Sequence, residues 1–547
     1  SSTTGNANTA IGGAGMFNCV TGTNNVTVGH NAGEKLLASN NAAVGALAMK
    51  YATLNDHCVA IGSSALIGAA PQAVTCTLVA IGDATITCSS TAHINVGYSV
   101  TGTGIPAGAT VASINAGTGG ASVTSFELSA VATANGSQSI TFASNTGNQN
   151  IAIGSYTLDA INTGSSNVAI GYNAGTAVTT GTRNIILGEA AAAAMLVATD
   201  NIVIGSSALD AANGTESYNI AIGTHSLGTE TSNASGCVAI GHYALNDQNV
   251  AAANNVAIGF QAALNLDDGT DSVYMGYKAG GVGLITGSDN VAIGQEAGLN
   301  MTSAESCVYI GRRAAGLGIA TGNDNVAIGN AAGYDLTSGA SNVLIGTLAG
   351  QNLTEGLANI AIGHGALDAA DTSDARNYNV AIGKNTLGGQ TAAVSYCVAI
   401  GDSALVAQNA NVKNTAIGGL AGDAIEGGDQ NTLVGYMAGS GIVDGLRCTA
   451  MGDEAYLAGT GNDNTVVGAN SCKGAMTGSN NTCVGASAGL DLTGGPGNVL
   501  IGKSAGQGMD TGDYNIAIGF EAADVLAGNA TQNVAIGKHA LGGCTAA

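Results

Sequence analysis

The chain has 547 residues, of which 86 are glycine and only 9% are charged, with 13 Lys and Arg against 36 Asp and Glu. The net charge of −23 argues against a nucleic-acid partner, which requires a basic surface, and no run of 18 apolar residues indicates a membrane span. Hydrophobic residues make up 45% of the chain but are mostly Ala, Val, Ile and Leu. This composition favours a thin core repeated many times over one thick core.

A short unit similar to Asn-Val-Ala-Ile-Gly recurs along the chain, first at residues 8–12 and last at residues 533–537. Its closing glycine occurs in about 28 copies, and nearly all are spaced 16 to 18 residues apart. A fixed period this short predicts a solenoid. We therefore expect an all-β fold, a repetitive β-solenoid or β-roll of about 28 coils of 17–18 residues, with little room for a helix in any coil.

Each copy predicts one short strand followed by a bend. The residues three and one before the glycine are mostly Val or Ile, so they should lie on one face of the strand. We expect this face to fill the core of the coil. The residue between them is usually Ala, which would give a small face suited to close packing against a neighbouring chain. The glycine should adopt a positive φ.

The position four residues before the glycine is Asn in about 21 copies and Cys in five. A buried amide there can bond the backbone of the turns above and below, which predicts a structural ladder through the coils. The alternative is a solvated turn in which Asn merely tolerates a left-handed backbone. Cys in this position predicts buried free thiols, whereas Cys76 and Cys88 are close enough in sequence to be exceptions. The ladder residues are Asn25, Asn150, Asn167, Asn184, Asn201, Asn219, Asn255, Asn325, Asn342, Asn359, Asn498, Asn515, Asn533, Cys58, Cys237, Cys307, Cys397 and Cys448.

The repeat is interrupted between Gly82 and Gly154, where the spacing is 72 residues. We divide the chain into β-solenoid repeats at 1–82, an inserted antiparallel β domain at 83–147, and β-solenoid repeats at 148–547. Alternating apolar residues and turn signals in the insert predict four to six strands in a small β-sandwich or β-roll. The insert is either a ligand-contacting element or a spacer.

Two sequence motifs suggest chemistry but coincide with the repeat. GNVLIGKS at 497–504 matches a nucleotide-binding P-loop, yet its Val-Leu-Ile falls where every other copy predicts a strand. Nucleophile-elbow matches at 485–489 and 502–506 are likewise ordinary copies of Gly-x-x-Ala-Gly. A carbohydrate-active enzyme would need a pair of carboxylates facing a groove, and no recurring Asp or Glu pair stands out. We expect no enzyme, no catalytic residue and no cofactor.

Metal binding is weakly indicated at most. His30, His225, His242, His364 and His539 all follow the bend by one or two residues, where they should face solvent or a subunit seam. No His or Cys spacing typical of a zinc site occurs. Weak Ca²⁺ binding at acidic turns, such as the one at residues 267–268, is the alternative to a chain without metal.

The N-V-A-I-G-x-x-A-G units resemble the head repeats of YadA-type trimeric autotransporter adhesins. They resemble still more closely the T-G-x-x-N-x-A-I-G-x-x-A-L arrays of bacteriophage tail fibres. The resemblance covers residues 1–82 and 148–547, although the period here is longer than the nearly 14 residues of the adhesin heads. It implies a side-by-side homotrimer at a virion or cell surface, with end-to-end assembly and a host or surface glycan or receptor as further expected partners.

The expected function is a structural fibre whose rod-like shaft mediates attachment to a host cell or surface. The alternative is a bacterial cell-surface adhesin or a subunit of a self-assembling extracellular filament. Both readings place the chain outside the cell, without nucleic acid or membrane insertion.

Overall fold

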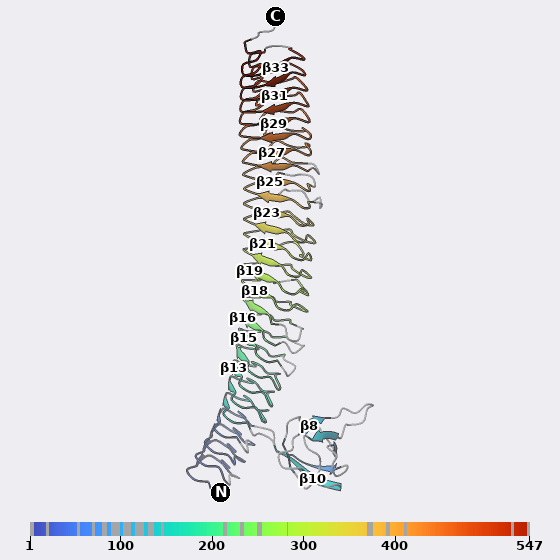
Figure 1. The fold of residues 1–547 in the computed structure, drawn as a ribbon. Coiled ribbons are helices and arrows are strands. Elements are labelled where there is room, and N and C mark those ends of the chain that lie inside the picture. The colour runs from blue at the N-terminus through green and yellow to red at the C-terminus, as the bar shows by residue number, and fades with distance from the viewer. Residues whose placement is uncertain are drawn as a thin grey trace. The chain divides into compact units, whose positions relative to one another are not determined.

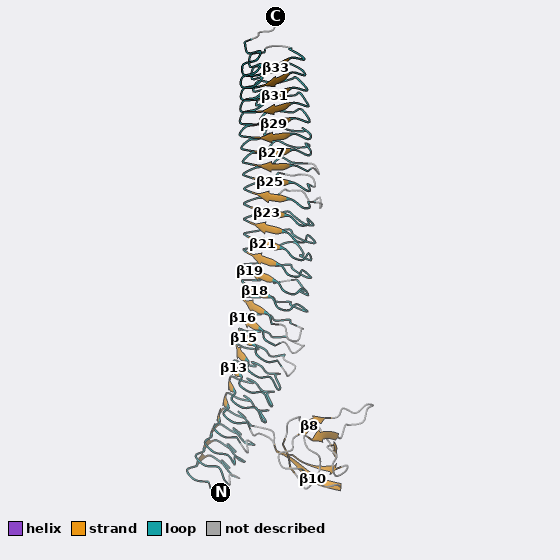
Figure 2. Ribbon diagram, in the orientation of Figure 1, coloured by secondary structure: helices purple, strands orange, loops and turns teal. Residues whose placement is uncertain are grey.

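The computed structural model forms two compact units, Ser1–Asp271 and Ser272–Ala547. Its described residues contain strands and loops and no helix, so none of them forms a helix able to cross a membrane (Figure 2). The structure describes residues 5–17, 21–51, 55–67, 72–78, 85–88, 99–101, 105, 111–114, 125–128, 136–143, 147–211, 216–229, 235–248, 254–281, 283–368, 376–389, 394–409, 413–526 and 530–543.

The first unit contains eleven solenoid strands, each three residues long, that pair in parallel. Equivalent residues of successive coils are partners, as Ile151 is with Val168. The strands are β1 (Thr9–Ile11), β2 (Val26–Val28), β3 (Ala42–Val44), β4 (Val59–Ile61), β11 (Ile151–Ile153), β12 (Val168–Ile170), β13 (Ile185–Leu187), β14 (Ile202–Ile204), β15 (Ile220–Ile222), β16 (Val238–Ile240) and β17 (Val256–Ile258).

The second unit repeats this arrangement with sixteen three-residue strands stacked one on the next (Figure 1). They are β18 (Val273–Met275), β19 (Val291–Ile293), β20 (Val308–Ile310), β21 (Val326–Ile328), β22 (Val343–Ile345), β23 (Ile360–Ile362), β24 (Val380–Ile382), β25 (Val398–Ile400), β26 (Thr415–Ile417), β27 (Thr432–Val434), β28 (Thr449–Met451), β29 (Thr465–Val467), β30 (Thr482–Val484), β31 (Val499–Ile501), β32 (Ile516–Ile518) and β33 (Val534–Ile536). The predicted all-β solenoid is confirmed.

Six further strands of the first unit form a separate antiparallel sheet in the order β7-β10-β5-β6-β9-β8. Their bounds are β5 (Gln72–Leu78), β6 (Thr85–Cys88), β7 (Ser99–Thr101), β8 (Val111–Ile114), β9 (Ser125–Leu128) and β10 (Gly136–Ala143). The pairings define one sheet. The described strands form no second sheet, and the rest of the predicted β-sandwich or β-roll falls on residues outside the described ranges.

The insert begins earlier than residue 83. Strand β5 already belongs to the antiparallel sheet, where Leu78 pairs with Gly136, and β4 pairs directly with β11 through Val59 and Ile151. The copy ending at Gly82 therefore contributes no strand to the solenoid in the described residues. Its ladder position is Leu78, which has no amide with which to bond the adjacent coils, so this segment lacks the interaction that holds the other coils together.

The strand faces are the reverse of the expectation. In β21 the central Ala327 is fully buried, whereas Val326 and Ile328 are half-exposed, and the other solenoid strands of the second unit share this pattern. The central residue shares the interior with side chains from the turns of its own coil. In this coil these are Ala332 and Leu336, both fully buried. The interior of each coil therefore takes one strand residue together with the side chains of the turns, and the other two strand residues face outward.

The interior balances large and small residues between the strand and the turn. Where the central strand residue is Leu344, its methyl groups lie against Gly333 and Gly350, and a Cβ on either glycine would come within 2.9 Å and 2.8 Å of them. Where the central residue is Ala381, the corresponding turn position holds the buried Leu387. In these two coils a large residue at one position is matched by a small residue at the other, as close packing favours.

The bend glycines are required by both backbone conformation and stacking. Gly346 has φ +134°, and a Cβ there would lie 2.5 Å from the carbonyl oxygen of Gly363 in the next coil. Since real Cβ contacts do not reach that distance, no other residue fits without a shift of the coil. The predicted positive φ at this glycine is confirmed.

Candidate functional site

The chemically distinctive feature of the solenoid is a buried column of side chains that connects successive coils. Asn342 shows its geometry. The backbone N–H and the Nδ2 of Asn342 both donate to Oδ1 of Asn325, each at 3.0 Å. Nδ2 also donates to the carbonyl of Gly356 at 2.7 Å, and Oδ1 accepts from the backbone N–H of Asn359 at 2.9 Å. One short amide thus serves the coil before it and the coil after it.

The structure brings the sequence-predicted ladder residues into this column in each unit. All of them are buried except Asn533, which is partly exposed near the last strand. In the first unit the amides of Asn150, Asn167, Asn184 and Asn201 are joined by three successive N–H to Oδ1 bonds, each of 3.0 Å. These contacts describe a buried ladder and not a solvated turn.

Cysteine takes the place of the amide without breaking the column. The backbone N–H of Cys307 donates to Oδ1 of Asn290 at 3.0 Å. Its Sγ donates to the carbonyl of Gly322 at 3.4 Å and accepts from the backbone N–H of Asn325 at 3.5 Å. At the insert, the backbone N–H of Asn150 donates to Sγ of Cys58 at 3.4 Å, so the column continues from β4 to β11. A thiol therefore supplies the same donor and acceptor roles with weaker bonds.

The five cysteines of the column, Cys58, Cys237, Cys307, Cys397 and Cys448, are free and buried. Burial raises the pKa of the Cys58 and Cys397 thiols to about 11, because the interior disfavours the thiolate. These groups remain protonated at neutral pH and can donate to the carbonyls that the amides bond elsewhere. Low reactivity follows, since the thiolate is the nucleophile.

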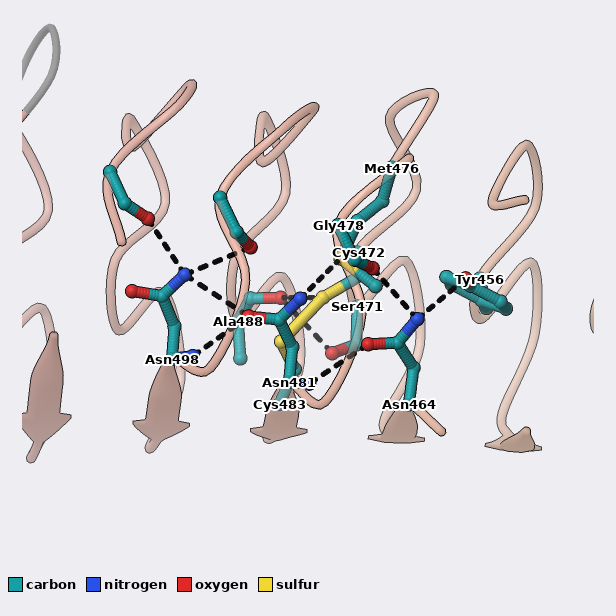
Figure 3. The surroundings of a disulfide bond; sticks show 12 residues. Tyr456, Asn464, Ser471, Cys472, Met476, Gly478, Asn481, Cys483, Ala488 and Asn498 are labelled. Carbon is teal, nitrogen blue, oxygen red and sulfur yellow. Dashed lines mark hydrogen bonds between the residues drawn. A yellow bond between two sulfur atoms is a disulfide. The ribbon is translucent and has the colours of Figure 1, made fainter. Parts of the chain in front are cut away.

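A disulfide bond joins two neighbouring coils of the second unit, which the expectation of free thiols missed (Figure 3). Cys472 lies in the turn after β29 and Cys483 is the central residue of β30, with 6.9 Å between their Cα atoms. Both positions point into the coil, and the equivalent residues of other coils, such as Ala381 and Leu387, are buried as well. The signal was present in the sequence as two cysteines at interior positions of successive coils, but it required knowing which strand face is inside.

The solvent side of the turns carries ion pairs that also run from coil to coil. Arg447 Nε lies 2.7 Å from Asp463 Oδ1, one coil further along, and Arg183 pairs with Asp200 in the same way in the first unit. The guanidinium group of Arg447 lowers the pKa of Asp463, first through the hydrogen bond to that carboxylate. Exposed pairs of this kind contribute little to stability.

The histidines that the sequence singled out do not gather into a metal site. In the first unit, His225 stacks on Tyr243 with 5.0 Å between ring centroids, and the exposed His242 stacks on Phe260 at 5.6 Å. Within the described ranges there is no group of three or more His, Cys, Asp or Glu residues placed to hold a metal ion. In another acidic turn, the carboxylate of Asp429 accepts from the backbone N–H of Lys413 and from the Gln430 amide.

The segment at 497–504 that matches a P-loop contains a solenoid strand, as the repeat predicts. Val499–Ile501 forms β31, and Gly502 is the bend glycine with φ +132°. A P-loop would use the four residues between its glycines to wrap phosphate, but here three of them form β31 and pair with β30 and β32, and the fourth, Asn498, belongs to the buried column. Lys503 lies over the ring of Phe520 at 5.9 Å from its centroid.

No protein-family model matches the sequence, and no curated protein matches it either.

Proposed function

We propose that this chain is a structural fibre protein whose solenoid forms a shaft that attaches to a host cell or another surface. The observation that carries this proposal is the buried column. Its amides and thiols use their donors and acceptors on the neighbouring coils, as Asn342 does with Gly356 and Asn359. Because the polar groups of the column bond neighbouring coils, they stabilise a long stack of coils. We assign no reaction to the chain.

Two further features support an extracellular location. The bond between Cys472 and Cys483 is of a kind that persists in oxidising environments. The net charge of −23 favours solubility and disfavours nucleic acid as a partner. We propose a virion or cell surface as the location, and a surface glycan or receptor as the partner.

The antiparallel sheet of β5–β10 is the element that we propose contacts the partner. It interrupts the solenoid without breaking it, because β4 pairs directly with β11. A scaffold that continues on both sides of an inserted sheet is a common arrangement for a binding element. The direct pairing also makes the insert removable, since deletion of residues 69–143 would leave a spacing between Gly62 and Gly154 typical of the other coils.

The test compares the full chain with the variant lacking residues 69–143. Negative-stain electron microscopy of both should show thin rods, and a labelled full chain should bind its target cells while the deletion variant does not. Compact particles in place of rods would overturn the fibre proposal. Equal binding by the two proteins would overturn the role of the insert.

The second candidate is an adhesin or a subunit of a self-assembling extracellular filament. It is favoured by the in-register pairing of short strands of equal length, because such strands can extend a sheet from one chain to another. Rods much longer than one chain, growing with protein concentration, would support the filament. Rods of uniform length would support the attachment fibre.

A further inference from the structure

Two cysteines outside the column lie opposite each other in the inserted sheet. Strands β5 and β6 pair antiparallel, and their register makes Cys76 and Cys88 direct partners. Residues directly opposed in an antiparallel pair lie on the same face of the sheet, with their Cα atoms about 4.5 or 5.5 Å apart. Both separations fall within the range of about 4.4–6.8 Å that a disulfide bond spans. The backbone therefore places these two residues at a separation suited to a bond.

The two cysteines share their face of the sheet with apolar residues. Because alternate residues of a strand lie on the same face, Val74 and Leu78 belong to the face of Cys76, and so does Ile86, which lies opposite Leu78. The other face of these two strands holds Ala73, Thr75, Thr77, Thr85 and Thr87. Neither β5 nor β6 contains a His, Asp or Glu residue, so these strands supply no further ligand with which the thiols could hold a metal ion.

The cysteine pair lies at the seam of the sheet. In the order β7-β10-β5-β6-β9-β8, strands β5 and β6 are the two in the middle, so among the described strands only their pairing joins the two halves. Strand β5 forms seven residue pairs with β10 but only three with β6. The chain itself connects the two strands beyond Leu78 and Ile86, at one end of this short ladder, whereas Cys76 and Cys88 are the last pair at the other end. A bond between them would close the open end of the seam.

We propose that Cys76 and Cys88 form a disulfide bond that holds the two halves of the inserted sheet together, and that attachment requires this bond. The inference rests on the proposed function, in which this sheet contacts the partner. The extracellular location proposed above is also the kind of environment in which disulfides form and persist.

The bond forms by thiol–disulfide exchange with a disulfide oxidant such as oxidised glutathione. The thiolate of one cysteine attacks the oxidant, forms a mixed disulfide and releases one thiol. The thiolate of the other cysteine then attacks the protein sulfur of the mixed disulfide, which forms the bond between Cys76 and Cys88 and releases the second thiol. The two cysteines lose two electrons and two protons, and the oxidant gains them.

A peptide map of the full chain, equilibrated with oxidised glutathione, tests the bond directly. Free thiols are alkylated after denaturation, and a protease that cleaves before aspartate separates Cys76, in peptide 56–82, from Cys88, in peptide 83–158. The two peptides should travel as one species that only a reductant separates. Two separate peptides in the unreduced digest would overturn the inference.

Variants identify the partner of Cys88, because peptide 56–82 also contains Cys58. The link should persist in Cys58→Ala and disappear in Cys76→Val, and any other pattern would overturn the assignment. The bond between Cys472 and Cys483 lies within peptide 463–490, so it joins no two peptides and serves as an internal reference for oxidation.

The second test measures what the bond does for the sheet. The double variant Cys76→Val, Cys88→Val removes the bond, and Thr77→Val with Thr87→Val, the neighbouring pair of the same ladder, is the matched control. The backbone amides of residues 76–78 and 86–88 should exchange with deuterium at least about tenfold faster in the cysteine variant, because a bond that closes a short loop opposes local opening. The control should exchange like the wild type. Equal exchange in the cysteine variant and the wild type would show that the bond does not hold the seam.

Attachment of the labelled chains to target cells is measured on the same proteins. The cysteine variant should lose attachment while still forming rods, and the threonine control should keep it. If the cysteine variant attaches like the wild type, while deletion of residues 69–143 abolishes attachment, attachment does not require the bond. If that deletion leaves attachment unchanged, the proposed role of the insert fails, whereas the peptide map still decides whether the bond exists.

Discussion

The ladder makes a quantitative prediction at Asn342, whose neighbours in the column, Asn325 and Asn359, are both amides. Replacing Asn342 by Leu leaves the buried carbonyl of Gly356 and the backbone N–H of Asn359 without the partners they have now. At about 1–3 kcal/mol for each stranded group, we expect a loss of about 2–6 kcal/mol. Replacement by Cys should cost about 1 kcal/mol, because the column already accepts thiols with the same bonding pattern.

Replacement of Asn342 by Asp should be the most damaging change at neutral pH. The new oxygen would face the carbonyl of Gly356, 2.7 Å from the atom it replaces, and a buried carboxylate is disfavoured. Burial should raise the pKa of this carboxyl group in the folded state. The carboxyl group of the unfolded chain loses its proton above a pKa of about 3.9, whereas the folded protein keeps the proton up to its higher pKa. The free energy of unfolding therefore falls as the pH rises from about 3.9 to the pKa of the folded state. At pH 4 and below, the protonated acid donates to the carbonyl and the penalty should disappear.

Thermal and urea unfolding of the wild type and the three variants at pH 4 and pH 7.5 measure these effects. The exposed Asn330→Asp variant is the control for the change in charge, and it should unfold like the wild type. The expected order of stability at pH 7.5 is Cys, then Leu, then Asp. If Asn342→Asp is as stable as Asn342→Cys at pH 7.5, the column does not depend on its amides and the reasoning is wrong.

Three further results are expected. Gly346→Ala should cost about 2–4 kcal/mol in urea unfolding because of its positive φ and its contact with the next bend, whereas Gly419→Ala, whose Cβ would lie 3.6 Å from the nearest atom, should be nearly neutral; equal midpoints would contradict the stacking argument. Reduction of the Cys472–Cys483 bond, or its double replacement by Ala, should lower stability by about 2–3 kcal/mol for a loop of this length, and an unchanged melting temperature with reductant would disprove it. Cys397, whose pKa is raised to about 11, should react with a thiol reagent at pH 8 at least about 100-fold more slowly in the folded chain than in urea. Comparable reaction rates in the two states would show that the Cys397 thiol is not buried.

Much of the architecture could be predicted from the sequence, because a solenoid is a local structure repeated. The period fixed the coil, the bend glycine and the strand, since each coil contacts chiefly its neighbours. The ladder was also visible, because only Asn combines an acceptor with two donors in so short a side chain, and Cys is its nearest small substitute. GNVLIGKS could be recognised as a strand by its register alone.

The tertiary structure decided what the repeat left ambiguous. A strand of three residues has two faces, and its alternation of Val, Ala and Ile does not state which one is inside. That depends on the turns of the same coil, whose buried side chains such as Leu336 share the interior with the central residue Ala327, while Val326 and Ile328 face outward. The disulfide between Cys472 and Cys483 follows from the same choice of face. The start of the insert at β5 was also decided in three dimensions, because only the pairing of β5 with β10 and of β4 with β11 shows that the copy ending at Gly82 does not supply a solenoid strand in the described residues.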